Sequence, residues 1–335
     1  MRWAGSGSAC GTRRRSDVLS QQERGRDRST ALISKCFENP PAPLGLRPPL
    51  DQHRVSGYRL HMEIRTMPTK KYPSDGTCLF CMEQFDPPDL TDEHVVPEGI
   101  GGRYVLVKGS CKACAHESND LYENKAINGD FQLPRLLLGI KGKGKFGGMP
   151  RDLRHLPAVY AGDRTAGGEG ERLLDFAIED YPNRFHLPVY QPAGILAGVD
   201  RGGALAKFAM RQYNLGAPGL LNVTVKQPLI NGPLAQTLAK IAYCFAIGEL
   251  GKDGFDGAEI RDLLKGRRGD LYNLVGSSAR EESLPSITLH GLYMRERCGL
   301  VIVLIDLFAC CHNGKTRPYE VVVGRRQGAG RLRPA

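Results

Sequence analysis

Two pairs of cysteines constrain this sequence more than any other feature. Cys78 and Cys81 are separated by two residues, as are Cys111 and Cys114, and 29 residues lie between the pairs. Two thiolates at this spacing bind one side of an ion, and two pairs complete the tetrahedron of sulfur ligands that Zn²⁺ prefers in closed structural sites. The alternatives are a redox pair, which normally stands alone, and two unrelated surface pairs. The spacing therefore predicts that these four cysteines hold a structural zinc ion, which has no open position for catalysis.

The length and composition of the chain allow much more than a small metal site. The 335 residues, of which 41% are hydrophobic, are enough for two modest domains with a core. Ten cysteines are too few for a disulfide scaffold in a chain of this length. The longest apolar run, Leu300–Cys311, is interrupted by Asp306, and residues 1–15 lack the apolar core of a signal peptide. We therefore expect a cytoplasmic protein that does not span a membrane.

The N-terminal segment differs from the rest in composition. Residues 1–66 are rich in Arg and Pro without sustained periodicity, and more than half of the net charge of +10 lies there. This composition predicts a disordered basic tail. An arm that contacts phosphate is one interpretation, and a solvated tail is the interpretation that composition favours. If the natural start is Met62 or Met67, this segment is not part of the natural protein.

Residues 67–140 carry the clearest local signals. Leu90–Pro97 and Tyr104–Val107 have the composition of short strands, and Lys112–Ile127 has that of a helix. The glycine-rich segment Glu98–Gly102 predicts a tight connection between the two strands. The order strand, loop, strand, helix places one cysteine pair before the first strand and the other pair at the start of the helix.

The rest of the chain is expected to form a separate α+β domain at residues 151–325, after a Lys- and Gly-rich linker at residues 141–150. A helix is predicted at Pro233–Leu250, where apolar residues recur at helical spacing. This domain contains no recognisable catalytic set, so substrate recognition, ligand sensing and assembly are all open roles for it. Strands are predicted at Leu187–Tyr190, Gly194–Gly198, Leu289–Tyr293, Leu300–Phe308 and Tyr319–Val323, and a basic tail at residues 326–335.

A histidine and two acidic residues lie between the cysteine pairs. Asp92, Glu93 and His94 fall within the first predicted strand. An imidazole beside carboxylates suits a general base or a metal ligand, although a hydrogen-bonded structural histidine is the better explanation for such a triplet in isolation. If the strand is extended, Asp92 and His94 share one face and Glu93 lies on the other.

These motifs together resemble the HNH endonuclease family. The resemblance rests on the two cysteine pairs, on the acidic residues and His94 followed by Pro97 and Gly101-Gly102, and on the polar helix, in this order within residues 75–130. It implies a ββα-metal fold in which His94 is the general base and Glu93 binds a divalent ion. A His or Asn on the helix would complete that metal site.

The sequence departs from the family pattern at two positions. Ala115 follows the second cysteine pair, where family members often have His or Asn, and His116 and Asn119 are the nearest replacements. The Asn that usually lies between the Gly-Gly pair and the second cysteine pair is missing from Arg103–Lys108. That Asn helps to hold the loop that carries the base, so its absence bears on how the base is oriented.

The predicted ligands of a second, catalytic ion follow from both lines of reasoning. Strand alternation favours Asp92 and the resemblance favours Glu93, so both remain candidates. His116 and Asn119 belong to one polar stripe on the helix, and an ordinary solvated face explains that stripe equally well. The two lines of reasoning together predict Mg²⁺ or another divalent ion, with Asp92, Glu93, His116 and Asn119 as its candidate ligands.

Three lysines follow the predicted small domain. Gly139–Phe146 nearly matches a phosphate-binding loop, but Phe146 replaces the hydroxyl residue that the loop requires. We interpret Lys141, Lys143 and Lys145 as contacts to the phosphate backbone of a nucleic acid, and a plain flexible linker explains them equally well.

The motifs and the resemblance together predict a metal-dependent endonuclease that hydrolyses phosphodiester bonds in nucleic acid, with DNA favoured over RNA. His94 would remove a proton from the attacking water, and the divalent ion would stabilise the charged transition state. The alternative is a zinc-stabilised module that binds nucleic acid and whose nuclease site has decayed. The missing Asn favours this alternative, whereas the intact Asp92-Glu93-His94 favours the nuclease.

Overall fold

The computed structural model describes residues 66–140, 158–161, 172–174, 184–203, 208–214, 223–226, 231–282, 284, 288–311 and 316–327. All of them belong to one compact unit, Gly57–Ala335. The predicted N-terminal tail, the linker at 141–150 with Lys141, Lys143 and Lys145, and most of the C-terminal tail lie outside the described residues. Within those residues the protein is α+β, as the sequence predicts.

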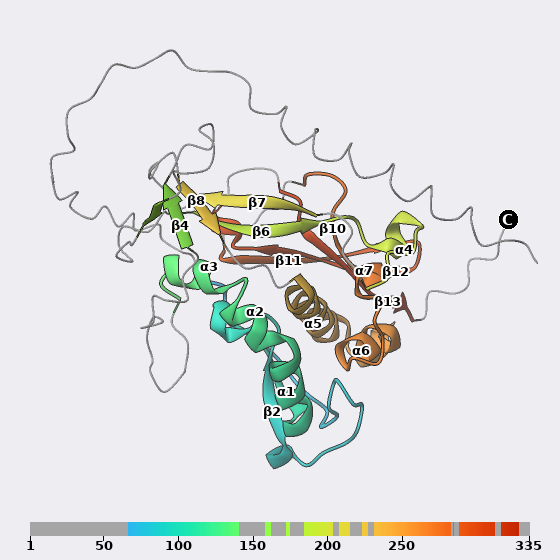
Figure 1. Ribbon diagram of the computed structural model, residues 1–335. Helices are drawn as coiled ribbons and strands as arrows, with labels where there is room; N and C mark the ends of the chain where they lie inside the picture. Colours follow the sequence, from blue (N-terminus) through green and yellow to red (C-terminus); the bar gives the residue numbers. More distant parts are fainter. Residues whose placement is uncertain are drawn as a thin grey trace, which may run out of the picture. The chain divides into compact units, whose positions relative to one another are not determined.

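The segment around the cysteines forms a small sheet followed by helices. Strands β1 (Lys70–Tyr72), β2 (Leu90–His94) and β3 (Tyr104–Cys111) lie in the order β1-β3-β2, with β1 parallel and β2 antiparallel to β3. The predicted order of strand, strand and helix is confirmed, although β2 ends earlier and β3 extends further than predicted. The helical part comprises α1 (Lys112–Ser118), the π-helical turn η4 (Asn119–Glu123) and α2 (Asn124–Asn128), and Figure 1 shows α1 and α2.

Two glycines make the connection between β2 and β3 tight. The short 3₁₀ turn η3 (Glu98–Ile100) ends at Gly101, whose φ of 91° is a left-handed conformation that favours glycine. A Cβ at Gly102 would lie 1.9 Å from the carbonyl oxygen of Val96, so only glycine fits there. The predicted turn at this position is therefore confirmed. Another 3₁₀ turn, η2 (Pro87–Asp89), leads into β2.

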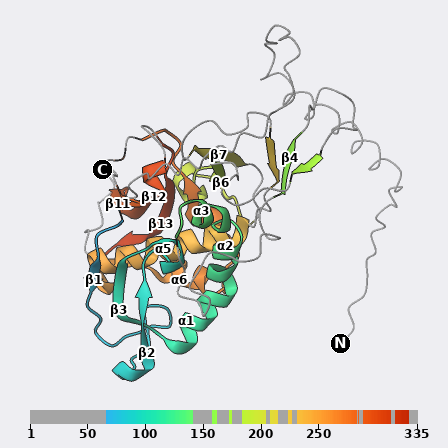
Figure 2. The ribbon, with the colours of Figure 1, turned by 90° about the vertical axis from the view of Figure 1, so that its left-hand side faces the viewer.

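Helix α5 (Asn231–Leu250) connects the small sheet with the larger one. It begins two residues before the predicted helix and is buried almost all round, since every residue from Leu234 to Ala246 except Gln236 is buried. A helix with apolar residues on all sides is covered on all sides. Helix α5 packs on η4 and α2 and also on β12 and β13, and Figure 2 shows it between the larger sheet and the small sheet.

The larger sheet has the strand order β10-β13-β12-β11, and β9 pairs with β13. Its central strand, β12 (Leu300–Leu307), is buried along its entire length, which explains the continuous apolar run in the sequence. Both long predicted strands near the C-terminus are present, and they pair antiparallel as β12 and β13. The other members are β9 (Phe255–Asp256), β10 (Val275–Ser277), β11 (His290–Arg297) and β13 (Tyr319–Arg326).

The remaining elements are short. Strand β6 (Arg184–Tyr190) contains the predicted Leu187–Tyr190 and pairs antiparallel with β7 (Phe208–Asn214). The predicted strand at Gly194–Gly198 is wrong: Gly194–Ala197 is the short helix α4, which Gly198 ends with a left-handed φ of 68°. A further sheet has the order β5-β4-β8. Other elements are α3 (Gln132–Leu137), β4 (Ala158–Ala161), β5 (Arg172–Leu174), β8 (Val223–Lys226), η7 (Lys252–Gly254), α6 (Ala258–Leu264), α7 (Leu271–Leu274) and η8 (Ala309–Cys311).

The described residues do not divide into two cores at the predicted linker. Buried side chains from both sides of residues 141–150 form one continuous hydrophobic cluster. The ring of Tyr104 on β3 stacks on Phe245 of α5, and the hydroxyl of Tyr243 donates to the carbonyl oxygen of Leu79 at 2.7 Å. The small sheet is too small to bury its own apolar face, so α5 supplies part of its core. No helix in the described residues has an apolar stretch long enough to cross a bilayer.

His290 links the connection after β2 to the larger sheet. Its Nε2 donates to the carbonyl oxygen of Ile100 at 2.8 Å, and its Nδ1 accepts from the backbone N–H of Phe308 at 3.2 Å. Both contacts require a neutral ring in this tautomer. Burial lowers the pKa of His290 to about 4, below the ordinary value of 6.5.

This shift of the His290 pKa predicts an acid-sensitive fold. Between pH 6.5 and about 4 the unfolded chain binds the proton and the folded chain does not, so the free energy of unfolding falls as the pH falls. The full effect is about 3 kcal/mol. Urea unfolding of wild type and His290→Gln from pH 7 to pH 5 checks it, because Gln keeps a donor and does not titrate. Equal pH dependence in both proteins would contradict the role of His290.

Candidate metal centre

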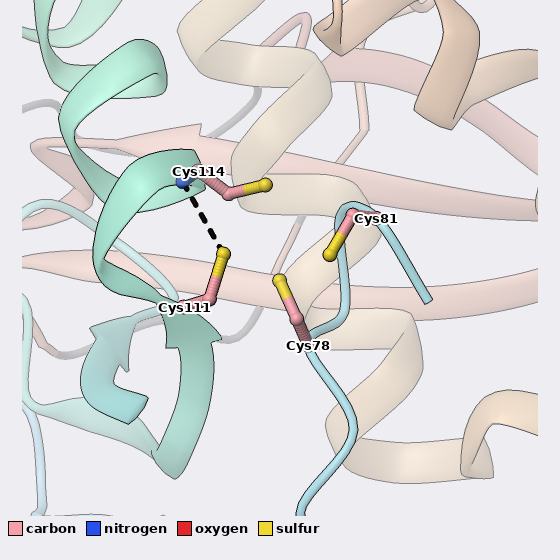
Figure 3. A group of neighbouring side chains, drawn as sticks. All are labelled: Cys78, Cys81, Cys111 and Cys114. Atoms are coloured by element: carbon pink, nitrogen blue, oxygen red, sulfur yellow. Dashed lines mark hydrogen bonds between the residues drawn. The ribbon is translucent and has the colours of Figure 1, made fainter. Parts of the chain in front are cut away.

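The four cysteines predicted to bind zinc converge. The Sγ atoms of Cys78, Cys81, Cys111 and Cys114 all lie within 4.8 Å of one another, and Figure 3 shows them pointing into one space. Four sulfur atoms bound to one zinc ion at 2.3 Å lie about 3.8 Å apart, so only a small adjustment is needed. The cluster is therefore close enough to hold one metal ion such as zinc. All four cysteines are free thiols.

Backbone hydrogen bonds hold the first cysteine pair in a compact turn. The N–H of Met82 donates to the carbonyl oxygen of Cys78 at 2.8 Å, and the N–H of Leu79 donates to the carbonyl oxygen of Gly109 on β3 at 2.9 Å. Met82 has a left-handed φ of 64°, which turns the chain back. The turn that carries Cys78 and Cys81 is therefore fixed directly to the strand that leads to the second pair.

The second cysteine pair lies where β3 becomes α1. Cys111 is the last residue of the strand and the N-cap of the helix, and its Sγ accepts a hydrogen bond from the N–H of Cys114 at 3.4 Å (Figure 3). This N-cap position replaces the usual oxygen with sulfur. The strand-to-helix junction therefore places both sulfur atoms toward the first pair.

The electrostatics of the cluster favour a bound cation. Burial raises the pKa of Cys81 to about 11, and the hydrogen bond with Cys78 and its charge add to the shift. Burial and the charges of neighbouring cysteines also raise the pKa of Cys114. Four thiolates this close repel one another unless a cation lies between them. Lys265, at the end of helix α6, adds a positive charge beside the cluster, with its Nζ 3.5 Å from the Cys114 Sγ.

His94, the predicted base, ends strand β2 with its ring partly exposed. Its side chain is 27% exposed, and its Nε2 lies 3.6 Å from the Glu98 Oε2. Its Nδ1 is buried without a hydrogen-bond partner in the described residues, so the exposed surface belongs to the rest of the side chain. Val105 lies opposite His94 in the sheet, and Lys71 lies opposite Val105 on the other side. Residues paired in this way share a face, so His94, Val105 and the exposed Lys71 form one row.

The residues predicted to hold a divalent ion are engaged elsewhere. Asp92 is exposed and accepts from the backbone N–H of Lys108 at 3.0 Å. Glu93 is buried, and its Oε2 accepts from the Ser110 Oγ at 2.9 Å. His116 is 79% exposed and its Nδ1 lies 3.0 Å from an oxygen of Asp120, as on a solvated helix face.

These residues do not converge on one point. Asn119 begins the π-helical turn that separates α1 from α2. Glu93 is buried and Asp92 is exposed, but the pairing of β2 with β3 is irregular between Thr91 and Glu93, so the burial along the strand does not follow strict alternation. Among the described His, Cys, Asp and Glu residues, the only group of three or more that could hold a metal ion is the cysteine cluster. The residues as arranged therefore do not fit a second ion of the kind that the resemblance implies.

A residue that sequence reasoning missed lies behind His94. Lys240 of α5 is 1% exposed, with its Nζ 2.5 Å from the Glu93 Oε1 and 2.6 Å from the Glu123 Oε1. The same Nζ donates to the carbonyl oxygen of His94 at 2.5 Å. Burial would lower the pKa of Lys240, but the charges of Glu123 and Glu93 outweigh burial and hold the pKa well above its ordinary value. The sequence signal was the single lysine of a mostly apolar helix.

The π-helical turn brings the second carboxylate to this lysine. η4 ends at Glu123, next to the fully buried Tyr122, and packs against α5. π-helical turns within α-helices are rare and often lie at functional sites.

Comparison with known proteins finds no matching family model, no matching curated protein and no matching solved structure.

Proposed function

We propose that this protein is a zinc-stabilised nuclease that hydrolyses phosphodiester bonds in nucleic acid, with His94 as the general base. One observation supports it above all: a cluster of four thiols lies at the end of a strand-strand-helix unit in which a partly exposed imidazole ends the first strand. In this proposal zinc occupies the thiol cluster and has a structural role. A cytoplasmic setting, where thiols stay reduced, suits such a site.

The proposed reaction uses the exposed side of the His94 ring. Nε2 takes a proton from a water molecule as the water oxygen attacks phosphorus, and the bond to the leaving 3′ oxygen breaks. The 3′ oxygen takes a proton from solvent. The Glu98 carboxylate, 3.6 Å from Nε2, stabilises the imidazolium that forms. The proposed reaction uses no divalent ion, because the residues predicted to bind one are engaged elsewhere.

The row of residues beside His94 offers a place for the phosphate. Adjacent strands lie about 4.8 Å apart, so Lys71 and His94 flank Val105 at a spacing that a lysine side chain can cover. An ammonium group binds phosphate oxygens without reading the base sequence. We therefore propose that the substrate backbone crosses this face of the sheet, and DNA remains the favoured substrate.

A second candidate function is a module that binds nucleic acid without cleaving it. The observation that favours it is the burial of Glu93, which the resemblance assigns to metal binding, against Lys240. A carboxylate that is paired with a buried lysine is not available as a metal ligand.

Replacing His94 with alanine is expected to lower plasmid nicking by about 10²- to 10⁴-fold, because a positioned base contributes that much to proton transfer. Nicking by the zinc-loaded full chain, assayed with and without Mg²⁺ or Mn²⁺, checks this. His186→Gln is the matched control, since this histidine lies on β6 and contacts Gln212. Equal cleavage by wild type and His94→Ala would exclude the mechanism. Binding of DNA without cleavage by either protein would favour the second candidate.

A further inference from the structure

A buried ammonium group lies where strand β2, turn η4 and helix α5 meet. The Nζ of Lys240 contacts one oxygen each from Glu93, Glu123 and the backbone of His94, at 2.5, 2.6 and 2.5 Å. These residues are far apart in the sequence and come from both sides of residues 141–150. The lysine side chain is 1% exposed, so neither solvent nor substrate reaches its charge.

Three oxygen atoms surround this ammonium group. An ammonium has three N–H donors and no acceptor. The carbonyl oxygen of His94 accepts a hydrogen bond from one of these donors, and the carboxylates of Glu93 and Glu123 contact Nζ as ion pairs. The other carboxylate oxygen of Glu93 accepts from the Ser110 Oγ at 2.9 Å, so both oxygens of Glu93 have partners.

The same three oxygen atoms resemble the ligand set of a hard divalent cation. Two carboxylates and one backbone carbonyl are the ligands that Mg²⁺ or Mn²⁺ prefers. A divalent ion could reach them only after it displaced the ammonium group, because two cations cannot share this space. The ammonium group of Lys240, which is covalently attached to the chain, therefore lies among oxygen atoms that would otherwise suit an exchangeable divalent ion.

We propose that Lys240 is the resident cation of this unit and takes the place of the divalent ion that the resemblance implies. The inference rests on the proposed function, because it assigns the second cation of the same site. Lys240 acts as a positioning residue: it holds the carbonyl oxygen of His94 from the interior, and α5 therefore becomes part of the site. The unit then needs zinc at the thiol cluster and no Mg²⁺ or Mn²⁺ at Glu93.

Binding of Mn²⁺ to the zinc-loaded full chain, followed by electron paramagnetic resonance, tests the proposal without any activity assay. Wild type and Glu93→Gln are expected to bind Mn²⁺ equally weakly. Lys240→Ala exposes two carboxylates and a carbonyl oxygen to the ion, and it is expected to bind one Mn²⁺ at least about tenfold more tightly than wild type, since added carboxylate ligands raise affinity. Lys240→Ala combined with Glu93→Gln is expected to lose this gain.

Two results would overturn the proposal. One is a wild-type chain that binds one Mn²⁺ which Glu93→Gln loses, because Glu93 would then be a metal ligand in the presence of Lys240. The other is a Lys240→Ala protein that keeps its zinc and its circular dichroism spectrum but gains no Mn²⁺ site. If Lys240→Ala does not fold, Mn²⁺ binding by wild type and by Glu93→Gln tests the proposal. Equally weak binding supports it, and a wild-type site that Glu93→Gln loses overturns it. Failure of the nuclease proposal is separate, because it appears as absent nicking whatever the Mn²⁺ result.

Discussion

Replacing Cys78 with serine is expected to release the bound zinc and to unfold the unit formed by β1, β2, β3 and α1. Zinc bound to a structural site contributes about 10–16 kcal/mol of apparent binding free energy at neutral pH, which is as large as the stability of a whole domain. Cys78 is fully buried and lies within 4.8 Å of the other three sulfur atoms, so its loss opens the site. Zinc content after gel filtration and unfolding monitored by circular dichroism check this.

Cys298→Ser is the matched control for the Cys78 variant. Cys298 is an exposed cysteine in the turn between β11 and β12, and it is not a member of the thiol cluster. Its replacement is expected to leave zinc content unchanged and to alter stability by less than about 0.5 kcal/mol, as is usual for surface substitutions. A Cys78→Ser protein that retains wild-type zinc content would contradict the assignment of Cys78 as a ligand.

Replacing Lys240 with methionine is expected to lower the free energy of unfolding by about 3–5 kcal/mol, because the carboxylates of Glu93 and Glu123 are then buried without their cation. Methionine fills similar space, so lost packing contributes little. Adding Glu93→Gln and Glu123→Gln to this variant is expected to restore most of the stability, since the buried charges are then gone. Urea unfolding of the zinc-loaded proteins measures all three.

The Lys112→Met variant serves as the control for a surface ion pair. Lys112 lies 3.4 Å from Asp89, and both side chains are largely exposed. Such pairs contribute about 0–1 kcal/mol, so this change is expected to have little effect. A Lys240→Met protein as stable as Lys112→Met would show that the buried ion cluster does not support the fold.

Local features of the sequence predicted the metal centre well. The cysteine spacing predicted four sulfur atoms around one point, and they lie within 4.8 Å of one another. The strand-strand-helix order was also predictable, because short-range composition determines where β2, β3 and α1 form. Glu98–Gly102 was recognisable as a turn from its glycines, and in the structure Gly102 leaves no room for a side chain.

Contacts between distant residues were not predictable in the same way. Lys240 meets Glu93 across 147 positions of sequence, and nothing near Lys240 indicates that carboxylates will surround it. The predicted division into two cores failed for the same reason, because α5 is buried on sides that face different parts of the chain. Gly194–Gly198 was wrongly predicted to be a strand. A glycine after a short apolar segment can follow a strand or end a helix, and here the left-handed Gly198 ends helix α4.

X-ray absorption at the zinc edge of the full chain tests the central claim most directly, because it reports the ligands of the bound ion. We expect one zinc ion per chain with four sulfur neighbours at about 2.3 Å and no nitrogen or oxygen in its first coordination shell. A chain that binds no zinc, or a zinc ion with nitrogen or oxygen ligands in place of sulfur, would contradict the account.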